Sequence, residues 1–258
     1  MNEVQTVEQK NEVGFSLEGD LPSHLKVQGE KLGAGAAIDE GIFNADIIIP
    51  KIRLQQRSAQ NFLEVPAGKF LNSVTGESLG EALAFVVIDS WKIWQKFAVN
   101  PNGQDEYISS ELFTTKNYNL PYEGKLEDGR DFKRRQGLYY AVLLMDDLKV
   151  GNTQVYNLDF FATSKPAGKE LITGLDKLNK SGAESFSVVF ALGNKFETFS
   201  NGNSAFVKKV KPMSYLPAEY IERVKEACLD LRTNKEDGRI VIDESDVVKH
   251  DPGLDVTF

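Results

Sequence analysis

The residues LGEALAFVVIDSWKIWQKFAV, at positions 79–99, decide the fold class of this sequence. They are rich in β-branched and aromatic residues and contain no proline, which is typical of strands in a half-buried sheet. The stretch therefore predicts two consecutive strands, Leu79–Asp89 and Trp91–Val99.

The same pattern continues on both sides, with turn residues between many of the segments. Asn201-Gly202 is the strongest hairpin signal, because both residues tolerate the positive φ of a type I′ turn. Helices are expected near residues 165–179 and 217–231, where apolar side chains of the second recur at helical spacing. Further strands are expected at Ile47–Leu54, Lys69–Thr75, Tyr107–Thr115, Gly137–Met145, Gln154–Thr163, Ser185–Leu192, Lys195–Ser200 and Asn203–Val210.

Strands dominate and the helices do not alternate with them, so the sequence predicts a mainly β (α+β) protein. We expect an OB-like β-barrel or a β-sandwich with one or two added helices. Residues 1–45 are predicted to form a polar N-terminal arm, residues 46–235 a strand-rich binding domain, and residues 236–258 an acidic C-terminal tail.

The formal net charge of −8 is unevenly distributed. The predicted tail holds seven acidic and two basic residues, which leaves −3 on the other 235 residues. A net acidic protein is an unusual partner for nucleic acid. Because the acid is concentrated in the tail, however, the net charge does not exclude such a partner.

Several protein classes are not expected. No apolar run approaches the ~18–20 residues of a membrane helix, and the N-terminus lacks the apolar core of a signal peptide. A cytoplasmic protein is therefore expected, in the host cytoplasm if the source is viral. His24 and His250 lack metal-ligand spacing, and Cys228 lies on the apolar face of a predicted helix. We expect no enzyme, no cofactor and no metal.

The second predicted strand, Trp91–Val99, has one unusual face. Lys92, Trp94 and Lys96 share it, so a tryptophan lies between two lysines on the side predicted to face solvent. An exposed indole can stack on a base while lysines neutralise the flanking phosphates. Alternatively, Trp94 packs under a neighbouring loop and the lysines extend past it to water.

Three further basic clusters accompany this face. If the strand Ile47–Leu54 continues, it carries a basic stripe on one side. A second cluster lies in Glu123–Gln136, which is predicted to be a loop, and a third follows the Asn201-Gly202 hairpin and its phenylalanines. An ordinary solvated surface is the alternative for each cluster alone. The nucleic-acid-binding candidates in these clusters are Lys51, Arg53, Arg57, Lys133, Arg134, Arg135, Phe199, Phe206, Lys208 and Lys209.

The acidic tail ends in an aromatic residue. A terminal phenylalanine with its carboxylate can insert into a pocket with a basic rim, while nearby acids steer it there. A frayed terminus is the alternative. The candidate partner-binding residues are Asp251, Asp255 and Phe258.

An acidic tail with a final Phe258, after a strand-rich body with basic and aromatic faces, resembles bacterial and T7-like phage single-stranded DNA-binding proteins. The resemblance implies an OB-fold that stacks bases on aromatics and a tail that recruits replication or recombination proteins and competes with DNA. The runs Ile48–Ser58, Ala67–Glu77, Ala162–Lys165 and Asn201-Gly202 also look like segments of uncharacterised tailed-phage proteins, which suggests a bacteriophage source.

The leading hypothesis is therefore sequence-tolerant binding of single-stranded DNA in viral DNA replication or recombination. The expected partners are single-stranded DNA and, through the tail, replication or recombination proteins; a homo-oligomer is possible and a membrane is not expected. Two alternatives stay open. The protein could be a virion structural component of the tail or capsid, or an inhibitor of a host nucleic-acid enzyme.

Overall fold

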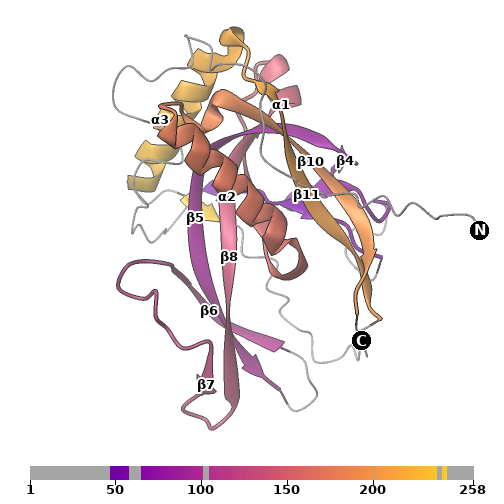
Figure 1. The fold of residues 1–258 in the computed structure, drawn as a ribbon, viewed down its shortest axis with the longest axis vertical. Coiled ribbons are helices and arrows are strands. Elements are labelled where there is room, and N and C mark those ends of the chain that lie inside the picture. Colours follow the sequence, from indigo (N-terminus) through magenta and orange to yellow (C-terminus); the bar gives the residue numbers. More distant parts are fainter. Residues whose placement is uncertain (1–46, 58–64, 101–104, 201, 237–239, 243–258) are drawn as a thin grey trace, which may run out of the picture.

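Two long antiparallel strands, β5 (Leu83–Val99) and β8 (Asp131–Leu144), form the spine of the protein (Figure 1). They pair along almost their whole length, from Phe85↔Leu144 to Val99↔Asp131, with one irregularity between Val87 and Asp89. The computed structural model describes residues 47–57, 65–100, 105–200, 202–236 and 240–242.

The two halves of this spine pair with different strands. In the upper half, β10 (Val188–Thr198) pairs with β5, β11 (Ser204–Tyr215) pairs with β10, and β9 (Val155–Phe160) pairs with β8. In the lower half, β6 (Asp105–Leu112) pairs with β5 and β7 (Glu123–Lys125) pairs with β8. We call residues 91–99 and 105–137 the lower lobe, which extends below the rest of the molecule in Figure 1.

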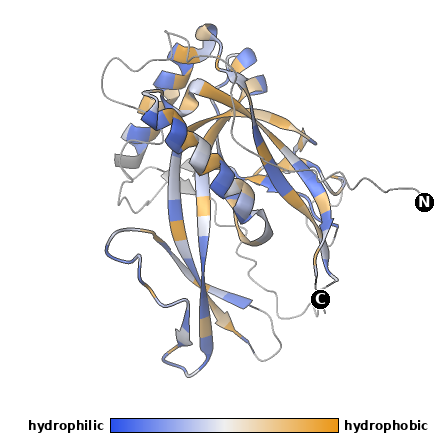
Figure 2. Ribbon diagram, viewed as in Figure 1, coloured by the Kyte–Doolittle hydropathy of each residue, from blue (hydrophilic) through white to orange (hydrophobic). Residues whose placement is uncertain are grey.

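Alternate residues of the spine enter two separate cores. Val86 and Ile88 face one core with helix α3 (Ile221–Glu236), while Phe85 and Val87 face the other with helix α2 (Lys165–Lys180). We call the two sides of the sheet the α3 face and the α2 face. Figure 2 shows the corresponding bands of hydrophobic and hydrophilic residues along the strands.

Helix α2 packs closely on the sheet because its first turns contain a glycine. A Cβ on Gly168 would lie 2.7 Å from the Cβ of Phe160, too close for any larger residue without a shift. The carbonyl of Gly168 also accepts a 2.7 Å hydrogen bond from the buried Tyr140 hydroxyl. Leu171, Leu175 and Leu178 then bury the same side of the helix at helical spacing.

The remaining elements surround this body. Strands β2 (Ile52–Leu54), β3 (Phe70–Asn72) and β4 (Ser78–Gly80) form a small sheet, and β1 (Ile47–Ile49) pairs in parallel with β12 (Ile240–Ile242). The short helices are α1 (Met145–Lys149), η2 (Ala162–Ser164), η3 (Ser185–Ser187) and η4 (Ala218–Tyr220). None of the helices in the described residues is long and apolar enough to cross a membrane.

The predicted fold class is confirmed: the protein is mainly β with added helices, and its large sheet is not closed into a barrel. Both predicted helices and the hairpin between β10 and β11 are present, and Cys228 is buried in the core of α3. Burial raises the pKa of its thiol. Three residues of the stretch predicted as tail, Ile240–Ile242, form β12, which pairs with β1.

Several boundary predictions were wrong. The strands predicted at Ser185–Leu192 and Lys195–Ser200 are one strand, β10, because β11 pairs with it from Val188 to Thr198, and the strand predicted at Ile47–Leu54 is divided into β1 and β2. The strands predicted at 79–89 and 91–99 are largely one continuous strand, because β8 pairs across the expected break at Ser90. The segment Glu123–Gln136, predicted as a loop, contains β7 and the start of β8. Its polar residues form strands because β5 extends to Val99 and supplies a pairing edge down to Asp131.

Candidate nucleic-acid interface

The lower lobe places three basic residues on the α2 face. Lys92 pairs with Leu138 and Lys96 pairs with Arg134, and paired residues of neighbouring strands point to the same side. Leu138 belongs to the core that α2 covers, which identifies the side. Lys92, Lys96 and Arg134 therefore share the α2 face, as the alternation of the sequence predicted for the first two.

Trp94, between these lysines, does not face solvent, although the base-stacking interpretation of the sequence requires that it does. Its side chain is only 1% exposed, because the loop after β6 folds over it. The indole Nε1 donates a 3.1 Å hydrogen bond to the carbonyl of Asn117. The ring centroids of Phe113 and Tyr122 lie 5.7 Å and 5.1 Å from the ring of Trp94. The alternative, that Trp94 packs under a loop, is what the structure has.

The loop that covers Trp94 brings other aromatic rings to the surface. Tyr122 is 57% exposed although it contacts Trp94, and Tyr118, in the same loop, is 58% exposed. Neither tyrosine is among the nucleic-acid-binding residues predicted from the sequence. The signal was the cluster of aromatic, asparagine and proline residues at 117–122, a composition that favours an exposed turn.

Helix α2 adds two lysines beside Lys92. Burial, and then repulsion from Lys165 and Lys169, lower the pKa of Lys92. Burial and repulsion from Lys169 likewise lower the pKa of Lys165. The first turn of α2 contains no acidic residue, so the positive end of the helix dipole adds to the positive charge.

Three cations on this side, Lys92, Lys96 and Arg134, also lie against aromatic rings. The Lys92 Nζ is 3.7 Å from the ring centroid of Phe113, while Lys96 Nζ and Arg134 Cζ lie 4.5 Å and 4.7 Å from that of Phe132. Among the described residues, none of the five cations on this side makes an ion pair. We call this set the basic face: Lys92, Lys96, Arg134, Lys165 and Lys169.

On the opposite side of strand β8 the cations form ion pairs. Lys133 and Arg135 alternate with Arg134 and so point to the α3 face. Both form ion pairs with Asp105 at 2.5 Å. These two predicted nucleic-acid ligands therefore already share an acidic partner from β6.

The predicted stripe on Lys51, Arg53 and Arg57 is not a continuous exposed surface. Strand β2 ends at Leu54, and Lys51 is only 2% exposed. Arg57 is exposed, but its guanidinium lies 4.1 Å from the ring centroid of Phe196. The stripe fails because the strand is too short to keep the expected alternation.

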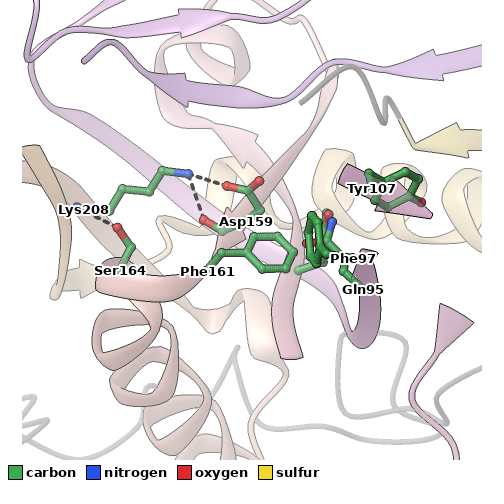
Figure 3. A pocket seen from close by; sticks show the side chains of 8 residues that line it. Gln95, Phe97, Tyr107, Asp159, Phe161, Ser164 and Lys208 are labelled. Carbon is green, nitrogen blue, oxygen red and sulfur yellow. Dashed lines mark hydrogen bonds and ion pairs between the residues drawn. The ribbon is translucent and has the colours of Figure 1, made fainter. Parts of the chain in front are cut away.

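Lys208 was predicted to bind nucleic acid but lies at the end of a cleft, with Asp159 and Ser164 (Figure 3). It is 7% exposed, and its neighbour Lys209 pairs with Glu197 at 3.0 Å. Lysines at adjacent positions of a strand point to opposite sides, so only one of the two can reach the surface.

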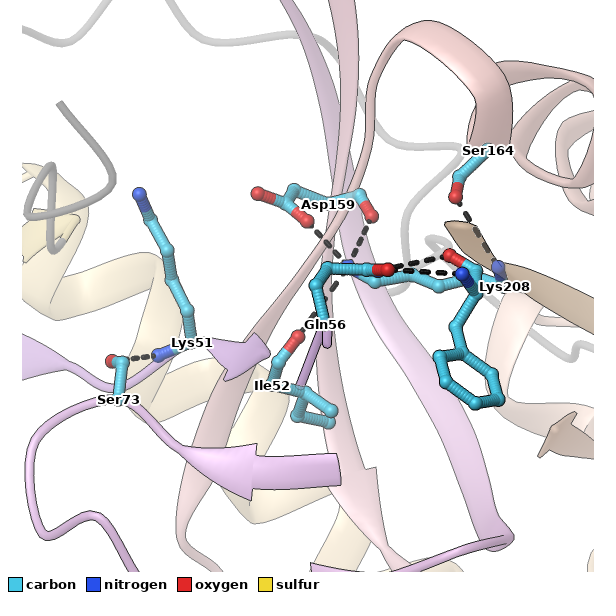
Figure 4. A network of polar contacts seen from close by, with 8 residues as sticks. Lys51, Ile52, Gln56, Ser73, Asp159, Ser164 and Lys208 are labelled. Atoms are coloured by element: carbon cyan, nitrogen blue, oxygen red, sulfur yellow. Dashed lines mark hydrogen bonds and ion pairs between the residues drawn. The ribbon is translucent and has the colours of Figure 1, made fainter. Parts of the chain in front are cut away.

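Lys208 connects several elements of the fold (Figure 4). Its Nζ donates to the Asp159 carboxylate at 2.5 Å, to the Asp159 carbonyl at 2.8 Å and to the Ile52 carbonyl at 3.4 Å. Its backbone N–H donates to Ser164 Oγ at 3.2 Å. Burial acts to raise the pKa of Asp159, but Lys208, with Lys51 and Arg53, more than offsets it and holds the pKa below its usual value.

The two phenylalanines predicted near this hairpin are partly buried. The backbone of Phe206 exchanges two 2.9 Å hydrogen bonds with the side chain of Gln56. Its ring lies 5.0 Å from that of Phe196 and covers Gly68. Phe199 belongs to the connection between β10 and β11. The structure does not bring either ring to the basic face.

Other predicted features lie outside the described residues: the N-terminal arm at 1–45 and the tail candidates Asp251, Asp255 and Phe258. Within the described residues, no group of three or more His, Cys, Asp or Glu side chains could hold a metal ion. No protein-family model, curated protein or solved structure matches the chain.

Proposed function

We propose that the protein binds single-stranded DNA along the basic face, with little sequence preference. The observation that carries the proposal is the gathering of five cations on one side of the lower lobe without an acidic partner among the described residues. A phosphate backbone supplies the missing negative charge and relieves the repulsion among Lys92, Lys165 and Lys169.

A single strand fits this surface better than a duplex. Tyr122 and Tyr118 are exposed next to the cations, and unpaired bases can stack on such rings whatever their sequence. In a duplex the bases are already stacked on each other. Strand β6 places two acids on this side. Glu111 pairs with Trp94 across the strands and lies 3.3 Å from the Asn117 amide, and Glu106 pairs with Ala98 and forms an ion pair with Arg130.

Fluorescence anisotropy with a labelled dT 20-mer tests the proposal at two or more salt concentrations. Five phosphate contacts predict a slope of log K against log salt of about −3 to −4, since each contact contributes about 0.7 for single strands. The triple variant Lys92→Gln, Lys165→Gln, Lys169→Gln is expected to lower this slope by about 2 units.

The matched control is the double variant Lys133→Gln, Arg135→Gln, which removes two cations of β8 from the α3 face of the sheet. It is expected to bind nearly like the unmodified protein, because both residues point to the α3 face and are already paired with Asp105. Equal losses in the two variants, or no binding of dT at low salt, would contradict the proposal. Ordered large oligomers without DNA binding would favour a virion structural protein instead.

A further inference from the structure

The cleft beside Lys208 has the dimensions and lining of a site for one flat ring system. Its volume is about 230 Å³, below the ~300–1,000 Å³ of pockets for drug-sized ligands. It lies on the α3 face, across the sheet from the basic face, because Phe97 and Gln95 alternate with Lys96 on β5.

Four aromatic rings line the cleft as two edge-to-face pairs. Phe97 and Tyr107 have ring centroids 5.9 Å apart at 73°, and Tyr139 and Phe161 have centroids 5.3 Å apart at 83°. Phe161 fits there because Gly137 has no side chain: a Cβ at that position would lie 2.0 Å from its ring.

The polar side of the cleft offers more acceptors than donors. All three N–H groups of the Lys208 ammonium are taken by Asp159 and Ile52. Among the described residues, no hydrogen bond reaches Asp159 Oδ2 and none involves the Gln95 amide. Ser164 Oγ accepts one hydrogen bond and retains its own proton to donate.

The backbone at the edge of the cleft is strained. Ala162, directly after Phe161, has φ of 41°, the one positive φ of a non-glycine residue in the part of the chain that the structure describes. Such conformations are energetically unfavourable and cluster at functional sites. Here the turn directs Phe161 and Ser164 toward the same cleft (Figure 3).

These features narrow the class of ligand. An anion would meet a carboxylate and an ammonium without a free donor. A cation would meet the Lys208 ammonium beside Asp159, and the charges of Lys51 and Arg53, which act on Asp159 from outside the lining, also oppose it. A purely apolar molecule would leave the carboxylate unsolvated. A neutral, flat ligand with hydrogen-bond donors at one edge satisfies all three conditions.

We propose that this cleft binds a single nucleobase, with guanine favoured. Guanine presents a ring N–H and an amino group side by side, which a carboxylate oxygen such as Asp159 Oδ2 can accept. Its adjacent carbonyl can receive a hydrogen bond from the Gln95 amide. Thymine presents one donor between two carbonyls, and a carbonyl next to a carboxylate is repelled. The base stacks on the aromatic wall.

This inference does not depend on the proposed function, because a nucleoside has no phosphate for the basic face. The test is a chemical-shift titration of ¹⁵N-labelled protein with deoxyguanosine and, separately, with thymidine. Deoxyguanosine is expected to move the Gln95 side-chain amide and the backbone amide of Phe161 and to bind at least tenfold more tightly than thymidine. Equal binding of the two nucleosides, or shifts confined to other regions, would overturn the inference.

The variant Gln95→Leu keeps the volume of the side chain and removes its hydrogen bonds, so it is expected to weaken deoxyguanosine binding about tenfold. Gln154→Leu, at an exposed position before β9, is the matched control and is expected to bind normally. An unchanged affinity in Gln95→Leu would count against the assignment.

A second experiment shows whether the bound base belongs to a DNA strand or to a free molecule. One dG placed within a dT 20-mer is expected to raise affinity if the cleft takes a base of the bound strand, and Gln95→Leu is expected to abolish the gain. No gain, with deoxyguanosine still bound, assigns the cleft to a free nucleoside or base. If dT fails to bind while deoxyguanosine binds, the proposed function fails and this inference holds.

Discussion

Lys208 and Lys92 differ in what surrounds them, although both are strand lysines largely withdrawn from solvent next to an aromatic ring. Lys208 has a carboxylate at 2.5 Å and two carbonyl acceptors. Lys92 faces Lys165 and Lys169, and its nearest described partner is the ring of Phe113. The comparison indicates that the local balance of charge, more than the basic residue itself, separates a lysine that holds the fold from one that can take a ligand.

The largest expected effect concerns Lys208. Lys208→Met leaves the Asp159 carboxylate without its partner in a site where only 15% of that side chain is exposed. Removing one partner of a buried pair typically costs about 3–5 kcal/mol, so we expect a loss of this size in the free energy of unfolding, measured by urea denaturation.

Two further variants test the cause of this loss. Lys209→Met, at the next and exposed position, is expected to stay within about 0.5 kcal/mol of the unmodified protein. The double variant Lys208→Met, Asp159→Leu is expected to recover most of the stability, because it also removes the unpaired charge. A double variant as unstable as Lys208→Met would show that the loss comes from packing and not from charge.

The next largest effect is expected in DNA affinity. It distinguishes the exposed Tyr122 from the buried Trp94. Tyr122→Ala is expected to weaken binding of the dT 20-mer by about 1–3 kcal/mol, the contribution of one stacked base, with little change in stability. Trp94→Phe keeps a ring but loses the hydrogen bond to Asn117, so we expect a stability loss of about 1 kcal/mol and a smaller loss of affinity than in Tyr122→Ala.

The outcome for this pair is measured by anisotropy and urea unfolding in parallel. If Trp94→Phe weakens binding more than Tyr122→Ala without affecting stability, then Trp94 contacts the base and the covering loop must open. That result would restore the role that the sequence alone predicted for Trp94.

The sequence predicted the features that depend on residues close together in the chain. Alternation correctly placed Lys92, Trp94 and Lys96 on one side of a strand, and the apolar spacing and turn chemistry located α3 and the β10–β11 hairpin. The sequence around Trp94 could not show which side of that strand is covered. The covering loop is held over the indole by a hydrogen bond to Asn117, 23 positions away.

Contacts between residues far apart in the chain also determine which cations form ion pairs. Asp105 reaches Lys133 and Arg135 from a different strand, about thirty positions away, and Asp159 reaches Lys208 across 49 positions. Lys165 and Lys169 were not selected from the sequence, because only the packing of α2 on the sheet brings them to Lys92. A basic cluster in a sequence therefore predicts charge but not its availability.

The smallest expected effect is a dependence on alkaline pH. The pKa values of Lys92 and Lys165 are lowered in the folded protein from the model-compound value of 10.5, so both residues lose charge at a pH where the unfolded chain still holds those protons. Between the lowered values and 10.5 the unfolded state binds more protons, and the contribution of these lysines to stability rises with pH. DNA affinity is expected to fall by a few-fold over the same interval, because the basic face loses positive charge.

The double variant Lys92→Arg, Lys165→Arg tests the cause, since arginine stays protonated throughout this range. We expect its affinity for the dT 20-mer, measured by anisotropy at constant ionic strength, to stay nearly flat from pH 7.5 to 10. Lys96, Lys169 and Glu111, which belong to the same region, are unchanged in this variant, so a remaining decline would assign the effect to groups other than Lys92 and Lys165. An affinity that falls as steeply as in the unmodified protein would remove Lys92 and Lys165 from the interface, and with them the contrast with Lys208.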